Sequence, residues 1–81
     1  MKPDGWLRDP KGKWLLCFVQ GPISSQKFPQ TYIDKWDVSP IGTPDKFVNR
    51  RIVGLEPAIE TWDELISSGW LIVDNQFGNA A

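Results

Sequence analysis

The sequence of 81 residues contains no histidine and a single cysteine, Cys17. The missing histidine removes the commonest general base and the commonest metal ligand, and one cysteine alone leaves no zinc site at any spacing. Cys17 cannot form an internal disulfide, which is typical of a reducing compartment. We therefore predict no metal site and no cofactor, and we expect a cytoplasmic location.

Recognisable catalytic motifs are also missing. The chain has no Gly-rich phosphate loop and no Gly-x-Ser-x-Gly nucleophile elbow. Cys17 lies inside the most apolar run, where a thiol is usually an inert small hydrophobic group. Asp63 and Glu64 are adjacent acids on an expected helix surface, whereas paired catalytic carboxylates face each other across a cleft. We therefore do not expect an enzyme.

Long hydrophobic runs are absent as well. No stretch approaches the roughly 18 to 20 apolar residues of a membrane span, and the N-terminus lacks the apolar core of a signal peptide. We expect no membrane association. The length predicts one small domain over residues 1–81, with residues 1–4 and 74–81 flexible.

Basic residues are confined to the first part of the chain. Residues 1–53 carry nine Lys and Arg against five Asp, a net charge of +4, and residues 54–81 carry five acids and no base, a net charge of -5. Two interpretations stay open. The acidic segment is either a solvated helix face, or it lies opposite a basic sheet surface that binds a partner.

One amphipathic helix is predicted over residues 57–68. Pro57 suits a first helical position, where its missing N–H needs no partner. Gly69 offers the left-handed conformation that commonly ends a helix. Five apolar residues recur at the spacing of one helical face and are expected to face the core: Ala58, Ile59, Trp62, Leu65 and Ile66.

The rest of the chain predicts short strands. Asp9-Pro10-Lys11-Gly12 has the residue chemistry of a type I turn and predicts a hairpin between residues 5–8 and residues 13–20. The apolar run in residues 13–20 is typical of the central strand of a sheet. Loops are expected at residues 21–30 and 39–45, and further strands at residues 31–38, 46–53 and 70–73.

Together these elements predict an α+β fold. Its core would be a mostly antiparallel sheet of four to five short strands packed against one amphipathic helix. Because twelve residues are too few for a helix that is stable alone in water, the helix needs the sheet to pack on.

Basic residues repeatedly stand beside aromatic ones. The adjacent pairs are Lys13-Trp14, Lys27-Phe28, Lys35-Trp36 and Lys46-Phe47, with Arg50 and Arg51 nearby. Aromatic rings that stack on bases and cations that hold phosphates are what a single-strand binder needs. Alternatively, the aromatics are core residues and the lysines their neighbours on the solvent side. The candidate binding residues are Trp36, Arg50, Arg51 and Lys13.

Three segments together carry a family resemblance. They are Gly5-Trp6-Leu7, Gly12-Lys13-Trp14-Leu15 and, from Ala58 to Trp70, the pattern Ala-x-x-x-Trp-x-x-Leu-x-x-x-Gly-Trp, with Arg50-Arg51 between them. The chain resembles a family of small uncharacterised proteins of marine cyanobacteria, a domain of unknown function. Residues 21–45 do not align. The resemblance implies a bacterial cytoplasmic setting and assigns no catalytic residue.

Binding is therefore the predicted class of function. The first hypothesis is a small non-enzymatic protein-interaction module, which includes self-association through an exposed strand edge or through Trp36. The alternative is a weak single-stranded nucleic-acid-binding protein that uses the basic, aromatic N-terminal two-thirds of the chain.

Overall fold

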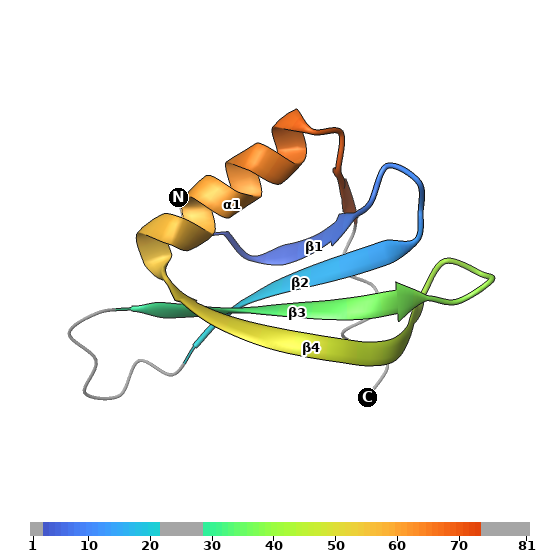
Figure 1. Ribbon diagram of the computed structural model, residues 1–81, viewed down its shortest axis with the longest axis horizontal. Helices are drawn as coiled ribbons and strands as arrows, with labels where there is room; N and C mark the ends of the chain where they lie inside the picture. Colours follow the sequence, from blue (N-terminus) through green and yellow to red (C-terminus); the bar gives the residue numbers. More distant parts are fainter. Residues whose placement is uncertain (1–2, 22–28, 74–81) are drawn as a thin grey trace.

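One antiparallel sheet, crossed by one helix, makes up the computed structural model of the chain (Figure 1). The structure describes residues 3–21 and 29–73. The elements are β1 (Gly5–Arg8), β2 (Trp14–Gln20), β3 (Gln30–Val38), β4 (Pro44–Gly54), α1 (Leu55–Ser67) and β5 (Leu71–Val73). Of the residues predicted to be flexible, 1–4 and 74–81, residues 1–2 and 74–81 lie outside the described residues, whereas Pro3 is described and fully buried. Residues 22–28 of the predicted first loop also lie outside them.

The five strands lie in the order β4-β3-β2-β1-β5, and every neighbouring pair is antiparallel. β2 is thus the middle strand, as its apolar run predicted. α1 leaves the β4 edge of the sheet and crosses one face to the β5 edge (Figure 1). The predicted α+β fold is confirmed.

The turn between β1 and β2 forms as its residue chemistry predicted. The Gly12 N–H donates to the Asp9 carbonyl at 2.8 Å, and the Asp9 N–H donates to the Trp14 carbonyl at 3.0 Å. Gly12 adopts a φ of 72°, a left-handed conformation that suits glycine. The Asp9 carboxylate accepts a further bond from the Lys11 N–H at 3.1 Å.

The helix begins two residues earlier than predicted. It runs over Leu55–Ser67, so Pro57 is its third residue, which is still within the first turn, where backbone N–H groups lack helical partners. The N-cap residue, Gly54, is extended and provides no side-chain cap. The Leu55 N–H instead donates to the Pro29 carbonyl at 3.1 Å. The start of the helix is therefore set by a contact between distant parts of the chain.

The predicted glycine stop of the helix is confirmed, and the helix ends at Ser67, one residue before the predicted end at 68. Gly69 has a φ of 99°, its N–H donates to the Ile66 carbonyl at 3.1 Å, and the Trp70 N–H donates to the Leu65 carbonyl at 3.0 Å. These two bonds form a Schellman motif, which uses carbonyls that the last helical turn leaves free. The motif turns the chain directly into β5, so that strand starts at Leu71 rather than at Trp70.

The third and fourth strands are longer than predicted. β3 begins at Gln30, and β4 extends over Pro44–Gly54 instead of residues 46–53. The loop between them is correspondingly short, because the Ser39 N–H donates to the Thr43 carbonyl at 2.8 Å and closes a tight turn. The register of the two strands shifts near Trp36, where β4 carries a bulge.

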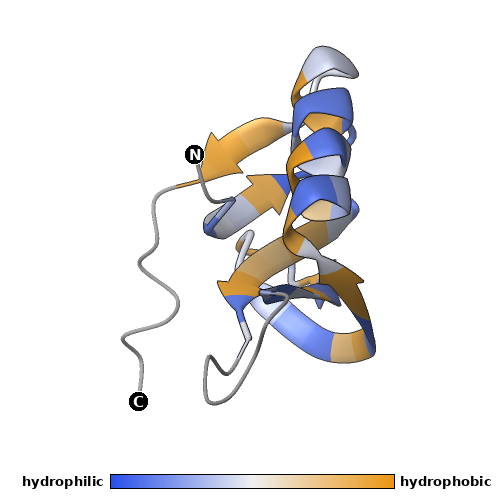
Figure 2. Cartoon of the chain, turned by 90° about the vertical axis from the view of Figure 1, so that its left-hand side faces the viewer, coloured by the Kyte–Doolittle hydropathy of each residue, from blue (hydrophilic) through white to orange (hydrophobic). Residues whose placement is uncertain are grey.

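The main core lies between α1 and the face of the sheet that it covers, which we call the helix face. Its buried cluster consists of Leu7, Leu16, Phe18, Ile33 and Trp62. The Trp62 ring meets Phe18 edge to face, with ring centroids 5.0 Å apart. Of the five predicted core residues of the helix, Ala58 and Trp62 are buried, but Ile66 is 38% exposed because it lies at the border of the apolar stripe. Apolar and polar residues alternate along α1 in Figure 2.

Candidate functional site

The candidate residues from the sequence are divided between two surfaces. Successive side chains of a strand point to opposite faces of a sheet. Trp36 and Arg50 therefore lie on the face away from α1, which we call the outer face, whereas Arg51 lies on the helix face. Lys13 is exposed at the end of the β1–β2 turn, just before β2. The structure thus brings Trp36 and Arg50 to one face and separates Arg51 from both.

Aromatic side chains form a row on the outer face. Trp36 has Trp6 on one side, with ring centroids 6.4 Å apart, and Phe47 on the other, at 5.5 Å in an edge-to-face geometry. Trp6 is buried, Trp36 is half-buried and Phe47 is 51% exposed. Leu15, which pairs with Trp36 across β2 and β3, is fully buried. The outer face therefore has a small apolar layer of its own.

Arg50 is already engaged within the molecule. Its Nε and Nη2 donate to the two carboxylate oxygens of Asp34 at 2.7 and 2.9 Å, and its guanidinium lies 4.4 Å above the Tyr32 ring. Asp34 is only 7% exposed, so this bidentate pair satisfies a buried carboxylate. The hydrogen bonds to Asp34 also raise the pKa of Arg50. Arg50 therefore holds the sheet together and is not a free cation for a ligand.

Cys17 lies on the outer face, opposite Trp6 on β1 and Asp34 on β3. Burial, with a further contribution from the Asp34 carboxylate, raises the pKa of the Cys17 thiol to about 11. At neutral pH the side chain is thus a protonated thiol, and only the thiolate is a good nucleophile. This agrees with its prediction as an inert group.

Alkylation of Cys17 should accordingly be slow in the folded protein. At pH 8 we expect iodoacetamide to react about 10 to 100 times more slowly than with an ordinary thiol of pKa about 8.5. The same chain unfolded in urea is the control and should react at the ordinary rate. Because the folded state holds the proton more tightly, stability should fall as the pH rises from about 8.5 toward 11. Equal rates for folded and unfolded chains would contradict this assignment.

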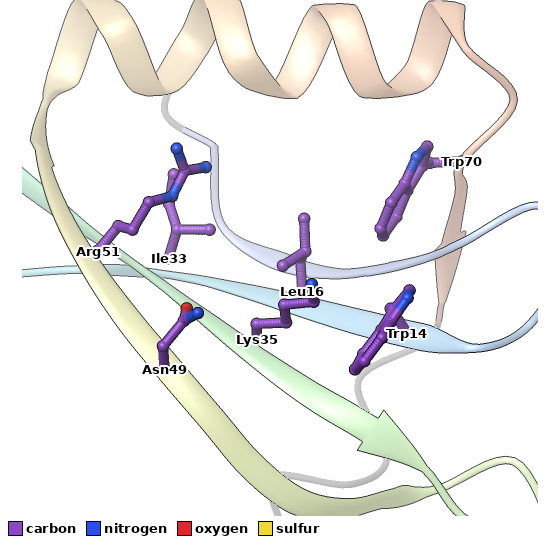
Figure 3. A pocket seen from close by; sticks show the side chains of 7 residues that line it. All are labelled: Trp14, Leu16, Ile33, Lys35, Asn49, Arg51 and Trp70. Carbon is purple, nitrogen blue, oxygen red and sulfur yellow. The ribbon is translucent and has the colours of Figure 1, made fainter.

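A groove on the helix face collects basic and aromatic side chains from distant parts of the chain (Figure 3). Its volume is about 270 Å³. Its lining consists of Trp14, Leu16, Ile33, Lys35, Asn49, Arg51 and Trp70. These residues contribute two cations, one amide and two indole rings, and none of them is acidic.

The pairing of cations with aromatics differs from the one that the sequence suggested. Lys35 and Trp36 are adjacent in β3 and point to opposite faces; the Lys35 ammonium instead lies 4.0 Å above the ring of Trp14 on β2. Lys35, Leu16 and Asn49 are directly opposite one another across three strands. Sequence reasoning placed Lys35 only in its pair with Trp36, and it did not assign Asn49 or Trp70 to a site. Successive side chains of a strand point to opposite faces, so this alternation along β3 and β4 could have predicted that Lys35 and Asn49 share one face of the sheet.

A comparison of the sequence with models of known protein families shows which family the chain belongs to. The model of a family described as protein of unknown function (DUF1651) matches residues 4–77. The chain belongs to this family. The DUF1651 match includes every strand and the helix, and it contains the three segments that carried the resemblance in the sequence. Searches of curated proteins and of solved structures find no match.

Membership of DUF1651 brings no assigned activity, so a function has to be argued from the surfaces described above. Within residues 3–21 and 29–73, the helix α1 is too short and too polar to cross a membrane.

Proposed function

We propose that this protein is a small non-enzymatic interaction module that self-associates through its outer face. One observation carries the proposal: α1 covers only one face of the sheet, and the opposite face exposes large apolar side chains. They are Val19 at 40%, Phe47 at 51%, Leu71 at 53% and Ile52 at 54% exposed. Exposed apolar groups that gather on one surface mark an interaction site more often than scattered ones do.

Three of these side chains lie in two apolar rows on the outer face. Val19, Tyr32 and Ile52 are directly opposite one another across β2, β3 and β4. Phe47 packs against Trp36 two rows further along, beyond the row that holds the Arg50–Asp34 pair. Tyrosine and tryptophan are enriched at the centres of protein interfaces. A row of β-branched and aromatic side chains across three strands suits a second sheet packed face to face.

A second copy of the chain is the partner that this surface fits. The buried acid of the face, Asp34, is neutralised by Arg50 within the same molecule, so two copies can approach without burying an unpaired carboxylate. Two identical apolar faces are self-complementary in a two-fold dimer. Such a dimer buries Ile52 and Phe47 without any change in the fold.

The test is the molecular mass measured by sedimentation or light scattering across a range of concentrations. The mass of the protein should rise from the monomer value of 9.2 kDa toward twice that value. Ile52→Lys should abolish the rise, because a charge would be buried within the interface. Ile41→Lys is the matched control: Ile41 is 84% exposed in the β3–β4 turn, away from the outer face, and its substitution should leave the mass unchanged.

Two results would overturn the proposal. One is a strictly monomeric mass up to concentrations of about 1 mM. The other is a dimer that persists in Ile52→Lys, which would place the interface elsewhere. An apolar interface should also respond little to ionic strength, in contrast to a nucleic-acid complex.

Weak binding of single-stranded nucleic acid is a second candidate function. The groove favours it, because Lys35, Arg51 and two tryptophans share one surface there without an acidic residue in the lining. A mixed single-stranded oligonucleotide should bind at low salt, with an affinity that falls steeply as the salt concentration rises. Affinity that does not respond to salt would contradict it.

A further inference from the structure

We propose that the groove on the helix face is a binding site for a nucleoside phosphate. The inference rests on the second candidate function and makes it specific: it names the site, the ligand and the part of the ligand that each side of the groove holds. Arg51 and Asn49 of β4 hold the phosphate, and Trp14 and Trp70 hold the base (Figure 3). The same chemistry serves a free nucleotide or one nucleotide of a strand.

Among the described residues, the cations of the groove have no carboxylate partner. Within the part of the chain that the structure describes, the ion pair joins Arg50 to Asp34, and neither Arg51 nor Lys35 takes part in one. The floor beside them is apolar, because Ile33 and Leu16 are 1% and 9% exposed. Two positive charges above an apolar floor attract an anion more strongly than the same charges in open water. Planar guanidinium groups also match phosphate oxygens in geometry.

The aromatic side of the groove explains why the ligand is more than a simple anion. Figure 3 shows Trp14 and Trp70 together at one side of the groove, away from Arg51 and Asn49 at the other. Trp70 packs against the core cluster and remains half-buried, so its ring is held in place. Base stacking on aromatic rings contributes about 1 to 3 kcal/mol per base and tolerates every base. A phosphate alone would leave both indoles unused.

Lys35 lies between the two sides. Its ammonium, 4.0 Å above the Trp14 ring, is held by a cation–π contact and lies close to the base side. One face of Trp14 is thus covered by Lys35, so the base stacks on Trp70 and packs beside Trp14. Lys35 can bond the phosphate or the sugar of the ligand without leaving the groove.

The size of the groove limits the ligand to one nucleotide. Pockets for small ligands are typically about 300 to 1,000 Å³ in volume, and this one, at about 270 Å³, is just below that range. A longer strand would place one nucleotide in the groove and leave the others outside it.

The experiment is a titration of the full chain with adenosine 5′-monophosphate, followed by NMR shifts of the backbone amides and the tryptophan side-chain N–H groups. We expect saturable shifts at Trp70, Trp14, Lys35 and Asn49, with a dissociation constant on the order of 1 mM or lower. Adenosine alone and inorganic phosphate alone should each bind at least about tenfold more weakly, because each uses one side of the groove.

Matched variants locate the site. Arg51→Gln should weaken binding of the nucleotide at least about fivefold, because it removes a charged hydrogen bond to the phosphate. Arg8→Gln is the control: it removes the same charge from β1, where Arg8 pairs with Leu15 on the outer face, and should change the affinity less than twofold. Lys35→Gln should weaken binding of the nucleotide by a factor similar to that expected for Arg51→Gln. The amide spectrum shows that each variant is folded.

An oligonucleotide arm separates the two sources of the ligand. A single-stranded oligonucleotide that shifts the same residues and binds at least about tenfold more tightly than the mononucleotide identifies a strand as the source. Equal affinities identify the free nucleotide. Absence of shifts with the mononucleotide, or equal losses in Arg51→Gln and Arg8→Gln, would overturn the inference. If the oligonucleotide then still bound elsewhere, the second candidate function would survive; if it did not, both would fail.

Discussion

Trp62→Ala is expected to lower the free energy of unfolding by about 3 to 5 kcal/mol. Trp62 is 6% exposed, and its ring meets Phe18 edge to face at 5.0 Å, in the middle of the contact between α1 and the sheet. The substitution removes this large apolar surface and leaves a cavity that the rigid sheet cannot fill. The total stability expected for a chain of this length is only about 4 to 12 kcal/mol.

Urea denaturation followed by circular dichroism measures this loss. Ile66→Ala is the control on the same helix: Ile66 is 38% exposed, and its truncation should cost less than about 1 kcal/mol. An unchanged unfolding midpoint for Trp62→Ala would show that α1 is not held on the sheet by this residue. That result would contradict the packing of the helix described above.

Leu15→Ala is expected to have the second large effect, about 2 to 5 kcal/mol. Leu15 points away from α1, yet it is fully buried on the outer face, directly opposite Trp36 in the register of β2 and β3. Its truncation removes the centre of the apolar layer that Trp6 and Trp36 cover. A loss of stability of this size would show that the sheet is packed on both sides of its central strand.

The control for this second substitution is Val19→Ala, on the same strand and the same face. Val19 is 40% exposed, so its truncation should cost less than about 1 kcal/mol in the monomer. Both variants are to be measured at low protein concentration, where self-association adds nothing to stability. If Leu15→Ala were as mild as Val19→Ala, the outer layer would contribute nothing to folding.

Local residue chemistry predicted the parts of the fold that depend on neighbours in the sequence. The turn at Asp9–Gly12 and the helix end at Gly69 follow from backbone conformations that these residue types favour, and both are found. The apolar run of β2 predicted a central strand because side chains on both of its faces need cover. The start of the helix could not be predicted in this way, because the hydrogen bond from Leu55 to Pro29 joins two distant segments.

The candidate site was less accessible to sequence reasoning. Adjacent residues such as Lys35 and Trp36 suggested a shared surface, but neighbours in a strand point to opposite faces. The groove also depends on the register of β2, β3 and β4 and on the place where the chain leaves the helix at Trp70. Strand order and register arise from long-range pairing, which a single sequence does not reveal.

The pleat of β4 affects how this protein can evolve by substitution. Arg50 and Arg51 are consecutive in the chain, yet one belongs to the outer face and the other to the groove. Two neighbouring codons therefore encode parts of two separate surfaces. A lineage can therefore change the groove through Arg51 and leave the outer face intact, whereas a change of Arg50 leaves the buried Asp34 carboxylate unpaired and costs stability.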